Sequence, residues 1–348
     1  TPTITLETGD TDVLVNYSSG TGTNTLTFDY TLATGNASND LDYVAINSLS
    51  LNNGSINDSA GNNATLTLPE PGAVNSLGAN KDLIVDTASP TVAIKSTTSG
   101  VNDGSTTSDA TIALTFTTSE STTDFVVGDI TVGNGALSSF TAVSGTVYTA
   151  TFTPSGQGAC TIDVAGNTFT DGASNNNAAA SQFNWTFDNV GPIVTGVSST
   201  KANGSYKEGE LIPIVVIFNE VVNVTGTPQI TLETGGTDAV VDYKSGTGTN
   251  TLSFDYTIAA GQNSADLDYV ATNSLSLNSG TIKDATENNA NLTLPAIGAA
   301  GSLALNKALI IDTTPPTVII ASTTGGVNDG STTSDATIAL TFTTNEST

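Results

Sequence analysis

The 348-residue sequence contains no histidine, no arginine and no methionine, and it has a single cysteine. Without histidine the chain cannot build Ser-His-Asp or Cys-His catalytic sites, nor histidine-ligated zinc or haem sites. Its seven basic residues are all lysine and stand against 33 acidic residues, which gives a net charge of −26. Because such a surface repels phosphates, we expect no nucleic-acid partner.

Long apolar runs are also missing. The longest nearly apolar stretch covers residues 211–218 and is broken by Pro213. A helix that crosses a bilayer needs about 20 apolar residues, so we expect no membrane span in this segment. No signal peptide is visible at Thr1 and there is no initiator Met. We therefore expect a mature chain or a window cut from a longer one.

The residues that are present favour β-structure. Hydrophobic residues make up 37% and charged residues only 11%, so Thr, Ser, Asn and Gly must cover the surface. Thr suits a half-exposed strand, whereas Asn, Gly and Ser suit turns. Cys160 lies in an alternating segment and is interpreted as a small buried strand residue, with an inter-chain crosslink as the alternative.

An internal repeat organises the chain. Residues 1–122 align without a gap to residues 227–348, and 88 of these 122 positions are identical. Proline-bearing joints with a preceding Asp divide the period, at residues 85–90, 187–192 and 311–316. They predict a short module at 90–191 and a long module at 192–315. The flanks, 1–89 and 316–348, are then a partial long module and a partial short one.

Each complete module shows about seven short alternating strands separated by turn residues. This pattern is typical of an antiparallel β-sandwich. In the short module the strands are expected near residues 91–96, 111–117, 130–132, 137–142, 147–152, 160–164 and 183–187. In the long module they are expected near 193–199, 211–218, 229–233, 239–243, 251–258, 267–277 (broken) and 308–312.

Several of these segments resemble bacterial immunoglobulin-like repeats. They are TFTTSE (115–120), GDITV (128–132), YTATFTP (148–154), GTIKDATEN (280–288) and its first copy GSINDSAGN (54–62). The resemblance implies an all-β fold of tandem immunoglobulin-like antiparallel β-sandwiches in an extended array. It also implies a setting in large secreted adhesins or fibres on a bacterial cell surface, where such modules are mostly spacers.

The 24 Asp and 9 Glu residues suggest a metal. Calcium prefers six to eight oxygen ligands from carboxylates, Asn side chains and backbone carbonyls, and this chain lacks the nitrogen and sulfur ligands that other metals favour. The alternative for any one Asp is a solvated surface that keeps the chain soluble.

Topology gives the calcium hypothesis a location. In an immunoglobulin-like sandwich the preceding joint, the end of the second strand and the last loop meet at one pole. In the short module these elements carry Asp86, Glu120, and Asp171 with Asn175. In the long module they carry Asp188, Glu220, and Asp284 with Asn288. The partial short module repeats two of them, Asp312 and Glu346.

Other patterns are weaker. Asp40 with Asp42, and Asp266 with Asp268, place two carboxylates on one strand face, which suggests a polar outer face or, as an alternative, a glycosidase pair. Thr-x-Thr runs are explained by strand alternation alone, and a flat threonine array of the ice-binding kind is the alternative interpretation. We expect no enzyme activity.

The leading functional hypothesis is a structural segment of a long extracellular bacterial fibre, filament or adhesin stalk with calcium-stiffened joints. A glycan- or surface-binding adhesin module is the alternative. The expected partners are neighbouring repeats or identical chains of a filament, and a surface or glycan is the other possible ligand. Because the repeat starts and stops inside modules, we expect strands from outside the segment to pair with those of residues 1–82.

Overall fold

The structure, a computed structural model, describes residues 1–346 of the chain. Within these residues, regular structure is nearly all β, with two four-residue α-helices, α1 (Leu77–Asn80) and α2 (Leu303–Asn306), and one 3-10 turn, Val127–Asp129. The all-β prediction is confirmed. Neither helix of this described part is long enough to cross a bilayer. The chain divides into two compact units, Thr1–Asp188 and Asn189–Thr348.

The first part of unit 1 is a small antiparallel sheet with a modest core. The sheet has the strand order β3-β2-β1-β5, and a separate pair joins β4 to β6. Leu6, Val15, Leu41, Tyr43 and Val85 form the buried cluster. The strands are β1 (Thr3–Leu6), β2 (Val13–Ser19), β3 (Thr27–Phe28), β4 (Ala37–Ser38), β5 (Leu49–Ser50) and β6 (Val85–Asp86).

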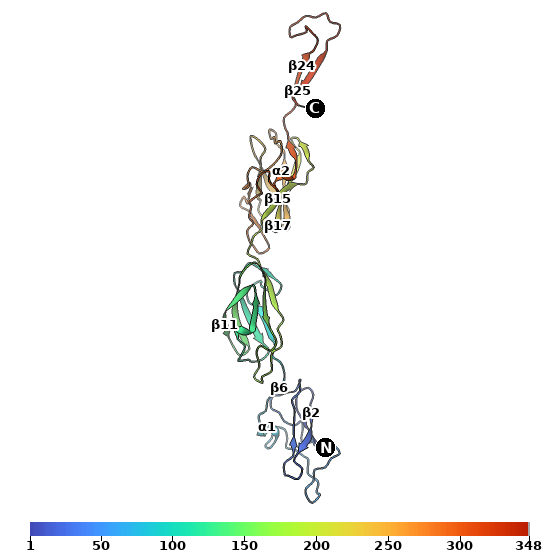
Figure 1. Cartoon of the computed structure of the whole chain (residues 1–348), viewed down its shortest axis with the longest axis vertical. Helices are drawn as coiled ribbons and strands as arrows, with labels where there is room; N and C mark the ends of the chain where they lie inside the picture. The colour runs from blue at the N-terminus through green and yellow to red at the C-terminus, as the bar shows by residue number, and fades with distance from the viewer. Residues whose placement is uncertain (347–348) are drawn as a thin grey trace. The chain divides into compact units, whose positions relative to one another are not determined.

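The second part of unit 1 is a β-sandwich, drawn in cyan to green in Figure 1. One sheet has the order β11-β12-β9-β7 and the other β10-β13-β14-β8. All seven predicted strands are present, and a short eighth one, β8, was not predicted. The strands are β7 (Val92–Ser96), β8 (Thr106–Thr107), β9 (Ile112–Thr118), β10 (Ile130–Gly133), β11 (Gly135–Ala142), β12 (Val147–Pro154), β13 (Gly158–Val164) and β14 (Phe183–Phe187).

Strand alternation builds the core of this sandwich. Alternate side chains of β9 and β12 point inward and are almost fully buried, as are those of β13 and β14. Across the two sheets, the rings of Phe152 and Trp185 meet edge to face with 4.7 Å between centroids. Cys160 on β13 is buried as a free thiol, and burial raises its pKa. The interpretation of Cys160 as a buried strand residue is confirmed.

Unit 2 contains a larger sheet with the order β15-β17-β20-β19-β18-β21, in which β22 also pairs with β17, and a separate pair of β16 with β23. Its core includes Ile212, Phe218, Leu252, Phe254 and Tyr256. The strands are β15 (Val194–Ser199), β16 (Gly204–Tyr206), β17 (Leu211–Thr225), β18 (Gln229–Leu232), β19 (Ala239–Ser245), β20 (Thr249–Thr257), β21 (Leu275–Ser276), β22 (Thr281–Lys283) and β23 (Leu309–Ile311).

Strand β17 is longer than its predicted range of residues 211–218. Its first half pairs with β15 and β20, and after a shift at Asn219 and Glu220 its second half pairs with β22. Asn219 and Glu220 look like the end of a strand in the sequence, but the chain continues as a strand that pairs with β22. The expected strand at 267–277 is reduced to β21, with one bridge from Tyr269 to Leu232.

The last described segment of unit 2 is a hairpin of β24 (Val318–Ser322) and β25 (Leu340–Thr344), drawn in red in Figure 1. Its apolar side chains are exposed: Ile320 is 61% accessible and Phe342 63%. Their counterparts in the first copy, Ile94 and Phe116, are 9% and 0% accessible, because a second sheet covers them.

Two predicted surface carboxylates are buried instead. Asp42 is 8% exposed, and its carboxylate accepts backbone N–H groups of Tyr43 (2.9 Å), Gly72 (3.0 Å) and Leu77 (3.2 Å). Burial acts to raise the pKa of Asp42, but hydrogen bonds from the backbone of Gly72, Tyr43 and Gly78 and from the Ser76 side chain outweigh it and lower the pKa. Its repeat partner Asp268 is likewise buried and accepts the N–H of Tyr269. These residues anchor a loop, so they do not form a polar outer face.

We expect Asp42→Ala to loosen that loop by about 1–3 kcal/mol of local opening free energy, because three N–H groups lose their acceptor. Hydrogen exchange at Gly72 and Leu77 measures the effect. The matched control is Asp40→Ala, since Asp40 is exposed and two residues away; it should leave protection unchanged. Equal protection in both variants would show that Asp42 does not anchor the loop.

Candidate metal centre

Three carboxylates of unit 1 converge at one end of the sandwich. Asp86 lies at the end of β6, Glu120 two residues beyond β9, and Asp171 in the loop between β13 and β14. One oxygen of each lies within 4.8 Å of one oxygen of each of the others. The three elements that topology predicted to meet at this pole therefore do meet.

The loop that carries Asp171 is held by its own hydrogen bonds. Asp171 Oδ1 accepts the N–H groups of Ala173 (2.8 Å) and Asn175 (2.9 Å). Asn175 Nδ2 donates to Asp171 Oδ2 (2.9 Å) and to the backbone oxygen of Asp86 (3.0 Å). Asn175 thus lies in the predicted place, and it ties the loop to the residue that precedes the sandwich.

A second contact, which sequence reasoning missed, fixes the loop beside Glu120. The carboxylate of Asp124 accepts both the N–H (3.0 Å) and the hydroxyl (2.8 Å) of Thr170, and the hydroxyl of Thr122 (2.7 Å). Burial acts to raise the pKa of Asp124, but these hydrogen bonds together lower it. No spacing in the sequence points to this contact, because it joins two loops 46 residues apart.

The three carboxylates repel one another. Burial raises the pKa of Glu120 above its ordinary value, and the charges of Asp86 and Asp171 and a hydrogen-bonding contact with Asp86 raise it further. The electrostatic repulsion within such a cluster is relieved either by a proton on Glu120 or by a cation bound among the carboxylate oxygens.

The geometry fits calcium. Oxygens that share one calcium ion at 2.3–2.6 Å lie no more than about 5 Å apart, and the spacing in this cluster is within that limit. All the ligand atoms are oxygens, which suits a hard cation. Whether the predicted residues bind metal stays a prediction.

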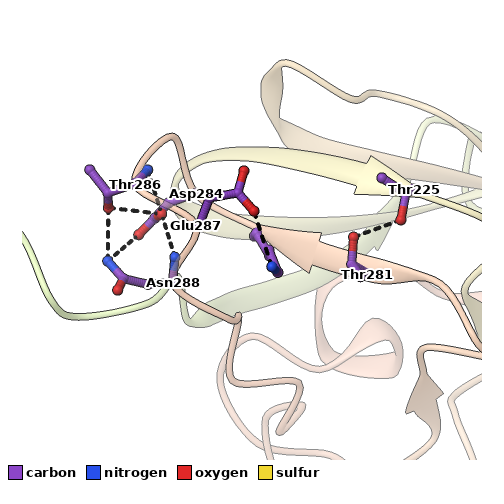
Figure 2. Close-up of polar contacts among 7 residues, drawn as sticks. Thr225, Thr281, Asp284, Thr286, Glu287 and Asn288 are labelled. Carbon is purple, nitrogen blue, oxygen red and sulfur yellow. Dashed lines mark hydrogen bonds and ion pairs between the residues drawn. The ribbon is translucent and has the colours of Figure 1, made fainter. Parts of the chain in front are cut away.

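Unit 2 contains the same kind of loop at Asp284. Figure 2 shows Asp284, Thr286 and Asn288 joined by hydrogen bonds. Asp284 Oδ1 accepts the N–H of Asn288 (2.9 Å) and Oδ2 accepts its side-chain Nδ2 (2.8 Å). Glu220 lies on β17 in this unit, whereas Asp188 is the last residue of unit 1. The positions of the two units relative to one another are not determined. The predicted set of Asp188, Glu220, Asp284 and Asn288 spans both units, so it stays a prediction.

The loop does not need a carboxylate cluster to form. In the first repeat copy, Asp58 accepts the N–H of Asn62 (2.8 Å) and its Nδ2 (2.8 Å), although Asp58 is exposed. The fourth residue has positive φ in all three loops, at Gly61, Ser174 and Glu287. One Asp and one Asn four residues apart therefore define a local fold, and only the neighbouring carboxylates make it a candidate metal site.

The partial short module repeats two elements of the pole. Asp312 accepts the N–H of Thr314 (2.9 Å) as Asp86 accepts that of Ala88 (2.9 Å). Glu346 follows β25 as Glu120 follows β9. One carboxylate oxygen of Glu346 is buried and has no hydrogen-bond partner among residues 1–346. The two elements thus recur in the same sequence order, and a shared metal site of Asp312 and Glu346 stays a prediction.

Comparison with known proteins agrees with the fold. Residues 86–187 match the sequence profile of a family described as "Bacterial Ig-like domain". A search of curated proteins found no match to the chain. The matched range begins at the Asp86 joint and ends with β14, so it contains both sheets of the sandwich and all three clustered carboxylates. Residues 86–187 form a bacterial Ig-like domain.

Proposed function

We propose that this chain is a structural repeat segment of a long extracellular bacterial fibre or adhesin stalk, and that calcium stiffens its joints. The observation that carries the proposal is the position of the three carboxylates. Asp86 belongs to β6, which pairs with β4 of the first part of unit 1. Glu120 and Asp171 belong to the sandwich that follows. One ion bound to all three would tie consecutive parts of the unit together.

The surface favours a stalk over a glycan-binding module. Carbohydrate sites usually present exposed aromatic rings, and among the described large hydrophobic residues Phe342 is the one exposed aromatic. The bacterial Ig-like family supports a surface or extracellular setting, and a net charge of −26 favours a soluble chain.

Distances between two spin labels test the proposed stiffening. The first label is placed at Asn16→Cys on β2 and the second at Thr153→Cys on β12; both native residues are exposed. Calcium should narrow the distance distribution relative to chelator, and Glu120→Gln should abolish the narrowing. A control pair at Thr131→Cys and Thr153→Cys, both inside the sandwich, should not change. The same distribution for the first pair with and without calcium would refute the stiffening role.

A further inference from the structure

The first and last strands of the unit 1 sandwich are hydrogen-bonded directly to each other. β8 follows the opening strand β7 and pairs with the closing strand β14, and the two paired strands run parallel. Thr106 and Thr107 lie opposite Thr186 and Phe187. The two ends of the domain are therefore joined by one short ladder, here called the sandwich ladder, that bypasses the strands between them.

Unit 2 has the same arrangement. β16 follows its first strand β15 and pairs in parallel with β23, the last strand before the joint at residues 311–316. Three consecutive residues from Gly204 lie opposite three from Leu309, and this pairing is here called the unit 2 ladder. The two ladders are not copies of each other in the internal repeat, which relates residues 1–122 to residues 227–348. The shared arrangement is therefore not a by-product of that repeat.

A side chain adds one bond at the start of the sandwich ladder. Asp103 precedes β8 and its Oδ1 accepts the N–H of Asn184 on β14 (2.8 Å). The next residue, Gly104, donates its own N–H to the Asn184 oxygen (2.7 Å). Asp103 and Gly104 thus satisfy both backbone groups of Asn184 and extend the ladder beyond β8.

The unit 2 ladder begins in the same way. Asn203 Oδ1 accepts the N–H of Ala308 (3.2 Å), and the following Gly204 donates to the Ala308 oxygen (3.0 Å). The two segments read Asp-Gly-Ser at 103–105 and Asn-Gly-Ser at 203–205. An acid or an amide with an acceptor oxygen, followed by glycine, therefore starts both ladders.

The aspartates of the joints close the other end of each ladder. The backbone N–H of Asp188 donates to the Thr107 oxygen (2.9 Å), and that of Asp312 donates to the Tyr206 oxygen (3.0 Å). Both aspartates belong to the proline-bearing joints. The chain therefore passes from the last bond of each ladder straight into a joint.

The parallel direction decides how tension acts on these ladders. Tension along the chain pulls the first strand of a domain towards the N-terminus and the last strand towards the C-terminus. Two parallel strands then slide past each other, so all the bonds between them are loaded together. In an antiparallel pair of terminal strands the bonds would open one at a time. Because a single hydrogen bond contributes little net stability, loading the bonds together is what makes a short ladder resist force.

We propose that the two ladders bear tension along the chain, and that Asp103 and Asn203 are tension-bearing residues because each supplies the side-chain oxygen of the first bond. The proposal deepens the stalk function and rests on it, since a stalk is loaded along its chain. It does not require calcium. The sandwich ladder precedes the seven-residue strand β9, whereas Glu120 of the carboxylate cluster follows that strand.

Single-molecule force spectroscopy of the 348-residue chain, held by its two ends in chelator, tests the proposal. At constant force, Asp103→Ala should raise the unfolding rate of the sandwich at least ~5-fold, because a ladder N–H loses its acceptor, and should leave unit 2 unchanged. Asn203→Ala should weaken unit 2 and leave the sandwich unchanged. The sandwich and unit 2 differ in length, so the extension gained on unfolding identifies each one. Chelator makes failure here distinguishable from failure of the calcium proposal.

Two further variants separate a role under tension from a general loss of stability. Asp103→Asn keeps the acceptor oxygen, as Asn203 does in unit 2, and should restore the wild-type rate. Ile130→Val shortens a buried side chain on β10, which pairs with β13 and not with the terminal strands. It should lower the melting temperature but raise the unfolding rate under force much less than Asp103→Ala. Equal rates for wild type and Asp103→Ala, a faster rate for Asp103→Asn, or the same rise for Ile130→Val would overturn the proposal.

Discussion

Calcium should raise the melting temperature of the Ig-like domain at residues 86–187. An ion that binds only the native state stabilises it by about 2.7 kcal/mol at a hundredfold excess over its Kd. For a domain of about 100 residues this corresponds to a rise of about 10 °C or more. Trp185, the single tryptophan of the chain, is buried in this core, so its fluorescence reports this transition. Identical melting curves in calcium and in chelator would contradict the expectation.

Glu120→Gln should have opposite effects in the two conditions. It should remove the calcium response, because a neutral amide is a weaker calcium ligand than a carboxylate. In chelator it should raise the melting temperature at neutral pH, because the repulsion among three carboxylates is relieved. A matched control is Glu7→Gln, which changes an exposed carboxylate outside the cluster. It should alter neither the calcium response nor the melting temperature in chelator.

The pH dependence in chelator has a definite sign. Since the folded-state pKa of Glu120 is raised above the ordinary value of 4.5, the folded protein holds this proton more tightly than the unfolded chain. The associated stability is present below pH 4.5 and is lost as pH rises through the folded-state pKa. As pH rises from 4.5 through the folded-state pKa of Glu120, the wild type should therefore lose stability relative to Glu120→Gln. A stability difference between the two proteins that does not change with pH would show that the pKa of Glu120 is not raised in the folded state.

Two phenylalanines in identical sequence surroundings should differ greatly in their contribution to stability. Phe116 is fully buried on β9, whereas its repeat partner Phe342 on β25 is 63% exposed. Phe116→Ala should destabilise the sandwich by about 3–5 kcal/mol, the usual cost of truncating a buried ring. Phe342→Ala should change stability by no more than about 0.5 kcal/mol.

Calorimetry of both variants measures this contrast, because it records every transition of the chain. Trp185 fluorescence independently assigns the Phe116→Ala loss to the sandwich. A comparable loss for Phe342→Ala would mean that the β24–β25 hairpin is covered in solution, and a small loss for Phe116→Ala would contradict the packing of the two sheets.

The sequence predicted most of the sandwich because its strands alternate cleanly between apolar and polar residues. The segment at residues 147–152, for example, places Tyr148, Ala150 and Phe152 on one face, and these are the buried side chains of β12. β8 was missed because two threonines carry no periodicity, and the second half of β17 was missed because Asn219 and Glu220 interrupt its pattern.

The candidate site was predictable only where topology determines position. Asp86, Glu120 and Asp171 follow from the rule that strand ends and joints meet at a pole. The contact between Asp124 and Thr170 depends on how two loops fold against each other, which no local pattern encodes. The burial of Asp42 was missed for a similar reason, because two of its backbone donors, Gly72 and Leu77, lie 30 and 35 residues away in the chain.

A crystal structure of the chain grown with calcium tests the central claim most directly. Anomalous difference density should appear among the carboxylates of Asp86, Glu120 and Asp171, with calcium–oxygen distances of about 2.3–2.6 Å. The same crystals of Glu120→Gln should lack that density. A wild-type structure with calcium present in the crystal and no ion among these three residues would contradict the calcium-stiffened joint.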